Sequence, residues 1–224
     1  MKHIQKLIAN EPASLREYRS TPGASYNDCN KNDIRIELLN EQGFICAYCN
    51  RRLKNDHDEK GNPNTRIEHY QARSDEKIGD SLKLNFMNML GVCNGNEGKP
   101  KHLFHCDKSR GNQELFIDPR NELCEGFVKY QSDGTIYSDD ERVEKDINEV
   151  LKLNNDKLIR GRKEIMLKVV SEMKRKYKKR QGETWKRSDL LSEINVWNTR
   201  ANNKFHPFCN TAIFYLNKKL SRLT

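Results

Sequence analysis

Apolar positions in the first half of the chain come in short runs separated by polar loops, which predicts small helices and short strands. Residues 34–39 have helical spacing, with Asn32 as a candidate cap and Gly43 where such a helix would stop. Residues 44–49 predict a strand that runs into a turn, and residues 66–70 predict a second short strand.

Other segments of this half are polar or contain Gly and Pro. Residues 1–28 have few periodic apolar positions, so we expect an extended N-terminal arm. Residues 54–65 have the composition of a loop. Residues 85–93 form an apolar segment that ends in a cysteine, and residues 105–111 could open a helix.

The second half begins with strands and then becomes helical. Residues 115–118 and 127–137 predict strands, and Asp133-Gly134 is a hairpin turn signal. Beyond Tyr137 the spacing predicts helices over 143–151, 156–180 and about 190–197, and a last one opened by Pro207. The expected fold class is α+β, with short hairpins followed by a mainly helical C-terminal region.

Positive charge is concentrated in that helical region. The net charge is +9, and residues 142–224 hold 21 basic against 9 acidic residues. This excess favours contact with a polyanion such as nucleic acid, although a solvated helical surface would also account for it. The densest run, in which Tyr177 could stack on a base, contains Lys174, Arg175, Lys176, Lys178, Lys179 and Arg180. A solvated helix end explains this run equally well.

Membrane insertion and secretion are not expected. No run approaches the ~20 apolar residues that a spanning helix requires, and residues 1–15 lack the apolar stretch of a signal peptide. We therefore expect a cytoplasmic protein with no membrane partner. Its seven cysteines should be reduced, so closely spaced ones indicate metal ligands or redox groups before disulfides.

Four cysteines have the spacing of a metal site. Cys46 and Cys49 form a C-x2-C pair, and Cys93 and Cys106 follow, separated by 12 residues. Four thiolates would make a closed tetrahedral structural zinc site, whereas a redox dithiol would need a βαβ context. His102 or His105 could replace Cys106 as the fourth ligand. The remaining cysteines, expected to be small buried hydrophobes, are Cys29, Cys124 and Cys209.

The cysteines enclose residues that could do acid–base chemistry. Glu68-His69 follows the first pair, Asn88 lies five residues before Cys93, and Asp107 follows Cys106. This order resembles the HNH (ββα-metal) endonuclease family, whose pattern ends in Cys-Asn/Asp/His and then Lys/Arg-Gly. The chain departs from that pattern in its 12-residue gap between the third and fourth cysteines, where the commoner form has two.

Further motifs resemble the PtuB-type HNH proteins of bacterial anti-phage systems, of the Septu kind and of some retrons. They are "MKHIQK", "EQGFICAYC", "HCDKSRG", "LFIDPR", "DGTIY" and "LKLNNDKLIRGR", and together they span residues 1 to about 165. The resemblance implies a zinc-stapled ββα-metal core over 29–137, between the arm 1–28 and a basic helical region 138–224. It also implies a nucleic acid substrate and a PtuA-like ABC/SMC-type ATPase as partner.

The resemblance assigns roles to four residues. His69 would be the general base, because its unperturbed pKa suits proton transfer near neutral pH. Glu68 and Asp107 would hold a catalytic Mg²⁺ or Mn²⁺, and Asn88 would brace the loop that orients the histidine. Two alternatives remain: a zinc-stabilised module that binds nucleic acid without cutting it, and an interaction protein whose cysteines carry redox chemistry.

Overall fold

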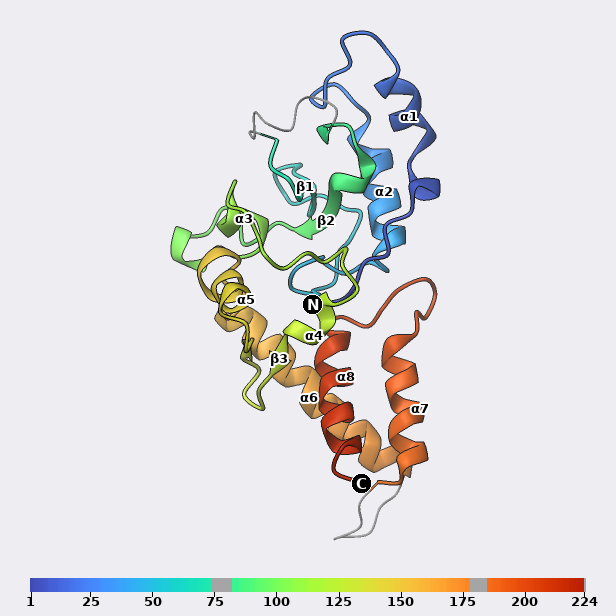
Figure 1. Cartoon of the computed structure of the whole chain (residues 1–224), viewed down its shortest axis with the longest axis vertical. Coiled ribbons are helices and arrows are strands. Elements are labelled where there is room, and N and C mark those ends of the chain that lie inside the picture. Colours follow the sequence, from blue (N-terminus) through green and yellow to red (C-terminus); the bar gives the residue numbers. More distant parts are fainter. Residues whose placement is uncertain (74–81, 178–184, 224) are drawn as a thin grey trace.

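The computed structural model describes residues 1–73, 82–177 and 185–223. Short strands, loops and small helices form one end of the molecule, and three long helices form the other (Figure 1). The helices are α1 (Ala13–Arg19), α2 (Lys31–Glu41), α3 (Asp107–Arg110), α4 (Cys124–Phe127), α5 (Glu141–Lys145), α6 (Asp156–Tyr177), α7 (Arg187–Asn198) and α8 (Cys209–Leu220). The strands are β1 (Thr65–His69), β2 (Met89–Cys93), β3 (Lys129–Tyr130) and β4 (Ile136–Tyr137). Single turns lie at η1 (Ile8–Asn10), η3 (Phe86–Asn88), η4 (Lys101–Leu103) and η5 (Asp146–Val150).

The predicted fold class is confirmed: two short antiparallel hairpins precede a mainly helical C-terminal region. In the first hairpin β1 pairs with β2, and His69 lies opposite Met89. All five residues of β2 are buried, and α2 packs against both strands. This packing explains why β2 is apolar along its whole length rather than alternating.

Helix α2 begins two residues earlier than predicted. The side chain of Asn30, not Asn32, caps it by accepting hydrogen bonds from the backbone N–H groups of Asn32 and Asp33. Gly43 follows the helix with a φ of +59°, as a helix-ending glycine should.

Two predicted strands are absent. Over residues 115–118, the carboxylate of Asp146 accepts hydrogen bonds from the backbone N–H groups of Phe116 and Ile117, at 2.7 and 2.8 Å. These N–H groups are therefore satisfied by a side chain rather than by a neighbouring strand. Over residues 44–49, one bridge joins Ile45 to Arg52 and the remainder turns back on itself.

The N-terminal residues are not extended throughout. Helix α1 occupies part of the predicted arm, and Met1, Ile4 and Leu15 are buried. The buried carboxylate of Glu41 holds this segment by accepting from Lys6 at 2.6 Å and from the backbone N–H of Leu7 at 3.1 Å.

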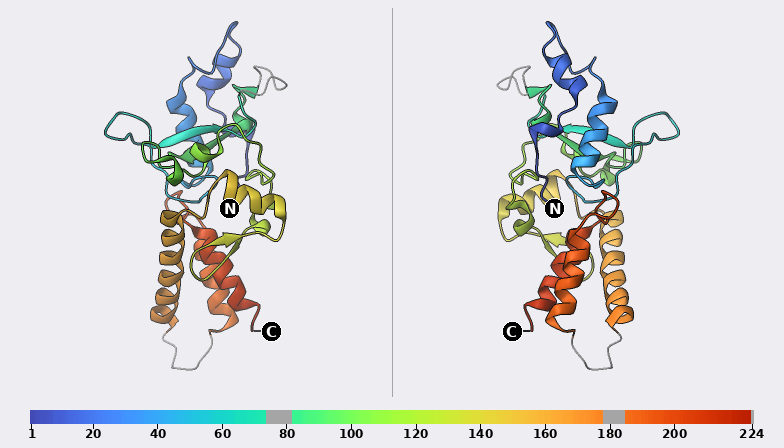
Figure 2. Two further views of the ribbon diagram at one scale, coloured as in Figure 1. Left: turned by 90° about the vertical axis from the view of Figure 1, so that its left-hand side faces the viewer. Right: turned by 90° about the vertical axis from the view of Figure 1, so that its right-hand side faces the viewer.

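The C-terminal helices pack on one another and on the first half of the chain. Helix α8 lies against both α6 and α7, around the buried side chains of Val169, Trp197 and Leu216 (Figure 2). Pro207 precedes α8 by two residues instead of opening its first turn. Within the described part of the chain, no helix has both the length and the apolarity required to cross a membrane.

The hairpin of β3 and β4 turns at Asp133-Gly134 as predicted. Gly134 has a φ of +96°, and its carbonyl accepts from Nε of the buried Arg162 at 2.6 Å. A Cβ here would collide with the backbone carbonyl of Ile159 in α6.

We therefore expect Gly134→Ala to lower the free energy of unfolding by about 2–4 kcal/mol, since it combines an unfavourable φ with overpacking. Urea denaturation measures this change. Gly126→Ala is the matched control, because no atom lies within 4 Å of the added methyl, and it should be neutral or slightly stabilising. Equal effects of the two substitutions would contradict the proposed close packing of hairpin and helix.

Candidate metal centre and adjoining cleft

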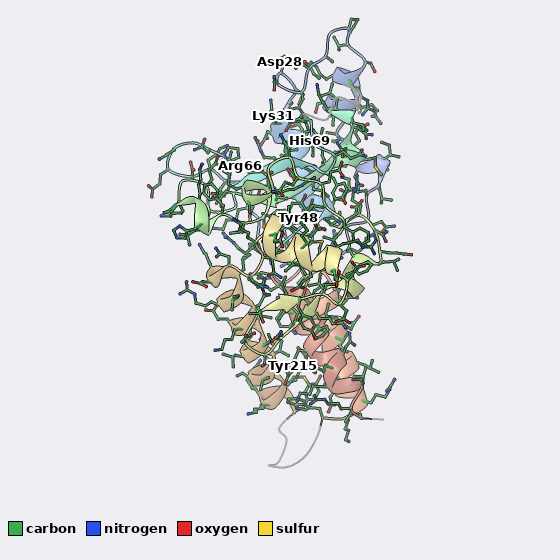
Figure 3. The ribbon with its side chains drawn as sticks, turned by 60° about the vertical axis from the view of Figure 1, so that its left-hand side comes forward. Asp28, Lys31, Tyr48, Arg66, His69 and Tyr215 are labelled. Carbon is green, nitrogen blue, oxygen red and sulfur yellow. The ribbon has the colours of Figure 1, made fainter. Side chains whose placement is uncertain are left out.

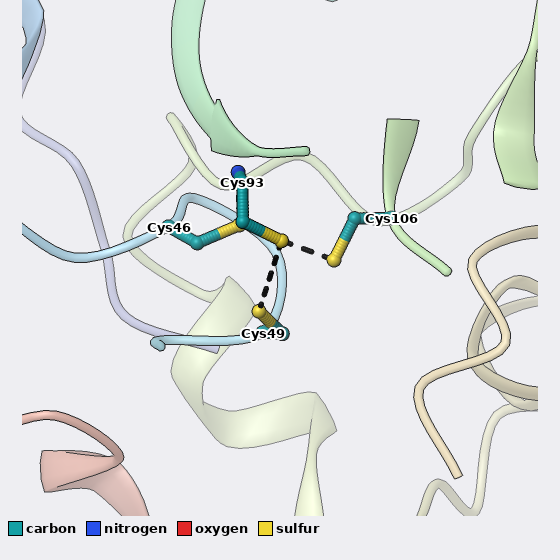
Figure 4. A group of neighbouring side chains, drawn as sticks. All are labelled: Cys46, Cys49, Cys93 and Cys106. Atoms are coloured by element: carbon teal, nitrogen blue, oxygen red, sulfur yellow. Dashed lines mark hydrogen bonds between the residues drawn. The ribbon is translucent and has the colours of Figure 1, made fainter. Parts of the chain in front are cut away.

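Four cysteines meet at the end of the first hairpin. The Sγ atoms of Cys46, Cys49, Cys93 and Cys106 all lie within 4.8 Å of one another, and all four residues are buried (Figure 4). Cys46 Sγ is 3.9 Å from Cys106 Sγ, and Cys49 Sγ is 3.8 Å from Cys93 Sγ. These separations exclude disulfides, and all seven cysteines are free thiols.

The cluster fits a zinc ion. A tetrahedral site with Zn–S bonds of ~2.3 Å requires sulfur atoms about 3.8 Å apart. Burial raises the pKa of the Cys49 and Cys106 thiols, whereas hydrogen bonds from neighbouring thiols lower the pKa of Cys93. Four buried cysteines at this spacing are consistent with a structural zinc ion, which would hold them as thiolates and compensate their charge.

The long spacing between Cys93 and Cys106 does not separate their thiols. The intervening loop closes on itself where the backbone N–H of His105 donates to the carbonyl of Gly95 at 3.2 Å. A side chain at position 95, whose φ is +57°, would collide with that loop.

Neither histidine replaces Cys106 in the cluster. His102 is exposed, and His105 is buried with Nδ1 3.2 Å from Cys106 Sγ. His105 is thus placed to hydrogen-bond to a thiolate ligand, a contact that commonly supports zinc sites. The three other cysteines are buried as predicted: Cys29, Cys124 and Cys209.

A buried arginine from α6 faces the cysteines. Arg162 is 2 % exposed and donates to the carbonyls of Gly134 and Leu153. Burial lowers its pKa, and the charges of Tyr130, Cys49 and Cys106 oppose that effect. A zinc ion with four thiolates carries two negative charges, which a nearby guanidinium would offset.

A cleft of about 730 Å³ is lined by residues of β1, α3 and the segment before α2. Its lining includes Glu68 and His69 from the end of β1 and Asp107 from the start of α3. The hairpin and α3 therefore bring together three of the four residues predicted to be catalytic, although they lie up to 39 positions apart.

His69 is 6 % exposed and is among the residues that line the cleft. Figure 3 shows it in the same part of the molecule as Tyr48 and Arg66. Its Nε2 is 2.9 Å from the carbonyl oxygen of Lys83, so Nε2 carries the proton and donates. Nδ1 has no hydrogen-bond partner among the described residues. Burial lowers the pKa of His69 to about 4, which leaves the imidazole neutral at pH 7.

Glu68 is held in place by its neighbours. Its Oε1 accepts from the hydroxyl of Tyr48 at 3.1 Å and from the guanidinium of Arg110. Burial and the nearby Asp107 carboxylate together raise the pKa of Glu68 to about 8, against the opposing effect of Arg110. The two carboxylates are thus close enough to repel each other.

Asn88 braces the start of the loop that follows β1. Its Oδ1 accepts from the backbone N–H of Gln71 at 2.8 Å, and its Nδ2 donates to the carbonyls of Gln71 and Leu82 at 3.1 and 3.4 Å. Asn88 does not line the cleft. Its contacts are those of a residue that holds the loop rather than one that touches a substrate.

The described part of the predicted basic run, Lys174–Lys176, lies in the last turn of α6, at the end of the molecule opposite the first hairpin (Figure 1). Lys176 Nζ is paired with Glu193 of α7 at 3.0 Å, and Lys174 and Arg175 are exposed. Lys178, Lys179 and Arg180 lie outside the described residues.

Tyr26 and Arg110 were not singled out from the sequence. The ring of Tyr26 packs edge-on against that of His69, with centroids 4.6 Å apart. Arg110 directly precedes the glycine of the "HCDKSRG" motif, and this position in the motif is the sequence feature that could have identified it. No signal marked Tyr26, because it lies 43 residues before His69 in a segment without periodicity.

Comparison with known proteins finds no family model that matches this chain, and no curated protein matches it. Among the described residues, the cysteines form the one group of three or more metal-binding side chains. In the part of the chain that the structure describes, no third metal-binding side chain lies close enough to Glu68 and Asp107 to form such a group with them.

We expect purified protein to hold about one zinc per chain, because four thiolates saturate a tetrahedral ion. Cys106→Ser should abolish most of this zinc and lower the melting temperature. Metal analysis and thermal denaturation measure both. Cys124→Ser is the control, since that thiol is equally buried but outside the cluster. Retained zinc in Cys106→Ser together with loss in His105→Ala would instead make His105 the fourth ligand.

Proposed function

We propose that this protein is a metal-dependent endonuclease of the HNH (ββα-metal) class that hydrolyses phosphodiester bonds in nucleic acid. The observation that supports this function most is the position of His69, at the end of β1 in a polar cleft with Asp107. The order of two antiparallel strands and a short helix, next to a four-cysteine cluster, is compatible with that class.

His69 is suited to act as the general base. Its proton is on Nε2, which donates to the Lys83 carbonyl, so Nδ1 is left as the basic nitrogen that could accept a proton from water. The neutral ring is the form that a base requires. An anionic phosphate in the cleft would stabilise the imidazolium that proton transfer creates, and so raise the low pKa towards neutrality.

The carboxylates are suited to a divalent cation of the kind that nucleases use. Mg²⁺ is commonly held by one or two carboxylates together with substrate phosphate oxygens. Asp107 offers one, and Glu68, whose pKa of about 8 keeps it mostly protonated at pH 7, would become the second when a bound cation displaces its proton. When bound, Mg²⁺ or Mn²⁺ would offset negative charge on the departing 3′ oxygen. Asp107 is the better ligand, because Tyr48 and Arg110 already occupy one oxygen of Glu68.

We further propose, from the sequence resemblance alone, that the nuclease is the effector of an anti-phage system and acts with a PtuA-like ABC/SMC-type ATPase. The PtuB-type motifs quoted above support this role.

The second candidate is a zinc-stabilised module that binds nucleic acid without cutting it. One observation favours it: Glu68 is engaged by Arg110, and no third metal-binding side chain joins Asp107 within the described residues. We prefer nuclease activity because binding alone does not require a neutral histidine whose Nε2 is held by the Lys83 carbonyl and whose Nδ1 can accept a proton.

We expect His69→Ala to lower the cleavage rate by roughly 100- to 10,000-fold, the usual contribution of a general base. The assay incubates the protein with phage DNA, plasmid or tRNA, with and without the partner ATPase and with and without Mg²⁺. Zinc content and melting temperature should remain as in the unmodified protein.

His102→Ala is the matched control, since that histidine is exposed and lies outside the cleft, and its activity should be retained. Loss of folding in His69→Ala would show that the histidine is structural. Absence of cleavage under every condition would favour the binding module.

A further inference from the structure

Three basic side chains surround Tyr26 at the edge of the cleft. Nζ of Lys31 is 5.2 Å and Cζ of Arg73 is 4.6 Å from the centre of the Tyr26 ring. The charge of Arg35 also interacts with the phenol of Tyr26. Because Tyr26 packs against His69, these three cations, which we call the Tyr26 cluster, lie one ring away from the candidate base.

Among the residues that the structure describes, no carboxylate is paired with the Tyr26 cluster, although the charge of Asp107 also acts on Tyr26 and His69. Within the described residues no ion pair involves Lys31, Arg35 or Arg73. Lys31 donates to a neutral group, the backbone carbonyl of Asn27. The acidic residues nearest to Arg35 in the sequence, Asp33 and Glu37, also form no ion pair within the described residues, and Asp33 accepts a hydrogen bond from the hydroxyl of Ser14 instead.

Arg35 has an unsatisfied donor. Its Nε is buried and has no hydrogen-bond partner among the described residues. Burial lowers the pKa of Arg35, Tyr26 opposes that effect, and the like charge of Arg66 lowers it further. The unpaired Nε leaves the Arg35 charge poorly compensated inside the protein, and an anion bound among these crowded cations would stabilise it.

We propose that Lys31, Arg35 and Arg73 bind phosphates of the nucleic acid backbone that flank the position cut at His69. This inference rests on the proposed nuclease function for the identity of the anion. A backbone that enters the cleft at His69 must continue over one of its walls. Tyr26 and Arg73 line one wall, and Lys31 and Arg35 lie next to Tyr26 outside the lining.

The Tyr26 cluster and the described part of the predicted basic run lie at opposite ends of the molecule. Lys31, His69 and Arg66 lie in the same part of the molecule, whereas Tyr215 of α8 lies towards the opposite end (Figure 3). The end of α6, with Lys174 and Arg175, is also at that opposite end (Figure 1). A short substrate at His69 would reach the Tyr26 cluster first.

The test measures binding without cleavage. Fluorescence anisotropy in the His69→Ala background gives Kd for short duplex and single-stranded oligonucleotides, as DNA and as RNA, over a range of salt concentrations. We expect Lys31→Glu/Arg73→Glu to weaken binding at least tenfold. The slope of log Kd against log salt should fall by ~0.9 per lost phosphate contact on duplex DNA and ~0.7 on single strands.

Lys174→Glu/Arg175→Glu is the matched variant, because it changes the net charge by the same amount at the far end of α6. It should weaken binding of short oligonucleotides much less. Arg35→Gln, which removes charge but keeps most of the buried side chain, should weaken binding in the same direction as the first variant. Zinc content and melting temperature check that each variant folds.

Equal losses in the two double variants would overturn the inference, since net charge alone would then explain binding. An unchanged Kd in Lys31→Glu/Arg73→Glu would also overturn it. Neither outcome depends on cleavage, so a protein that binds through the Tyr26 cluster but never cuts would refute the nuclease proposal and leave this one standing.

Discussion

The four thiols of Cys46, Cys49, Cys93 and Cys106 join three segments that are far apart in the chain. Because their sulfur atoms lie at tetrahedral zinc spacing, the turn after Ile45, the end of β2 and the start of α3 must meet at one point. The first hairpin is short and has little core of its own. A metal at this point would supply the cross-links that so small a unit needs.

The cleft depends on this junction. Cys93 ends β2 and therefore fixes its partner β1, which carries His69 at its far end. Cys106 directly precedes Asp107, so the same ligand places that carboxylate at the cleft. Arg110, one turn along α3, then reaches back to Glu68 and to the backbone carbonyl of Tyr70. The candidate catalytic residues are thus positioned by groups adjacent to the metal ligands in sequence.

The helical region is joined to the same junction. The backbone N–H of Phe208 donates to the carbonyl of Asn50, one residue after Cys49, at 2.8 Å. Arg200 donates to the carbonyls of Asn40 and Glu41 at the end of α2. Buried residues of one cluster come from all three predicted domains, among them Met1, Cys93 and Phe208. The domain boundaries remain predictions, but packing crosses each of them.

Local patterns in the sequence were sufficient for most of the elements and for the four clustered cysteines, but not for helix α1. Helical spacing identified α2, α6 and α7, the Asp133-Gly134 turn identified the second hairpin, and paired cysteines identified the zinc-type cluster despite the 12-residue loop. Such features are encoded within a few residues, so no knowledge of the fold is needed to find them. The prediction of a strand over 115–118 was wrong because the side chain of Asp146, about 30 residues away, accepts the hydrogen bonds from the backbone N–H groups of Phe116 and Ile117.

Tertiary structure alone decided what surrounds the cleft. The sequence placed Glu68 beside His69, but only folding brought Tyr26 against the His69 ring, Arg110 onto Glu68, and Arg35 beside Arg66. It also separated the basic end of α6 from the cleft. These contacts arise from the packing of α2, the hairpin and α3 around buried side chains. The sequence shows which residue types are present and how they are spaced. The charge balance and burial of each side chain depend on its neighbours in space, which only the folded structure shows.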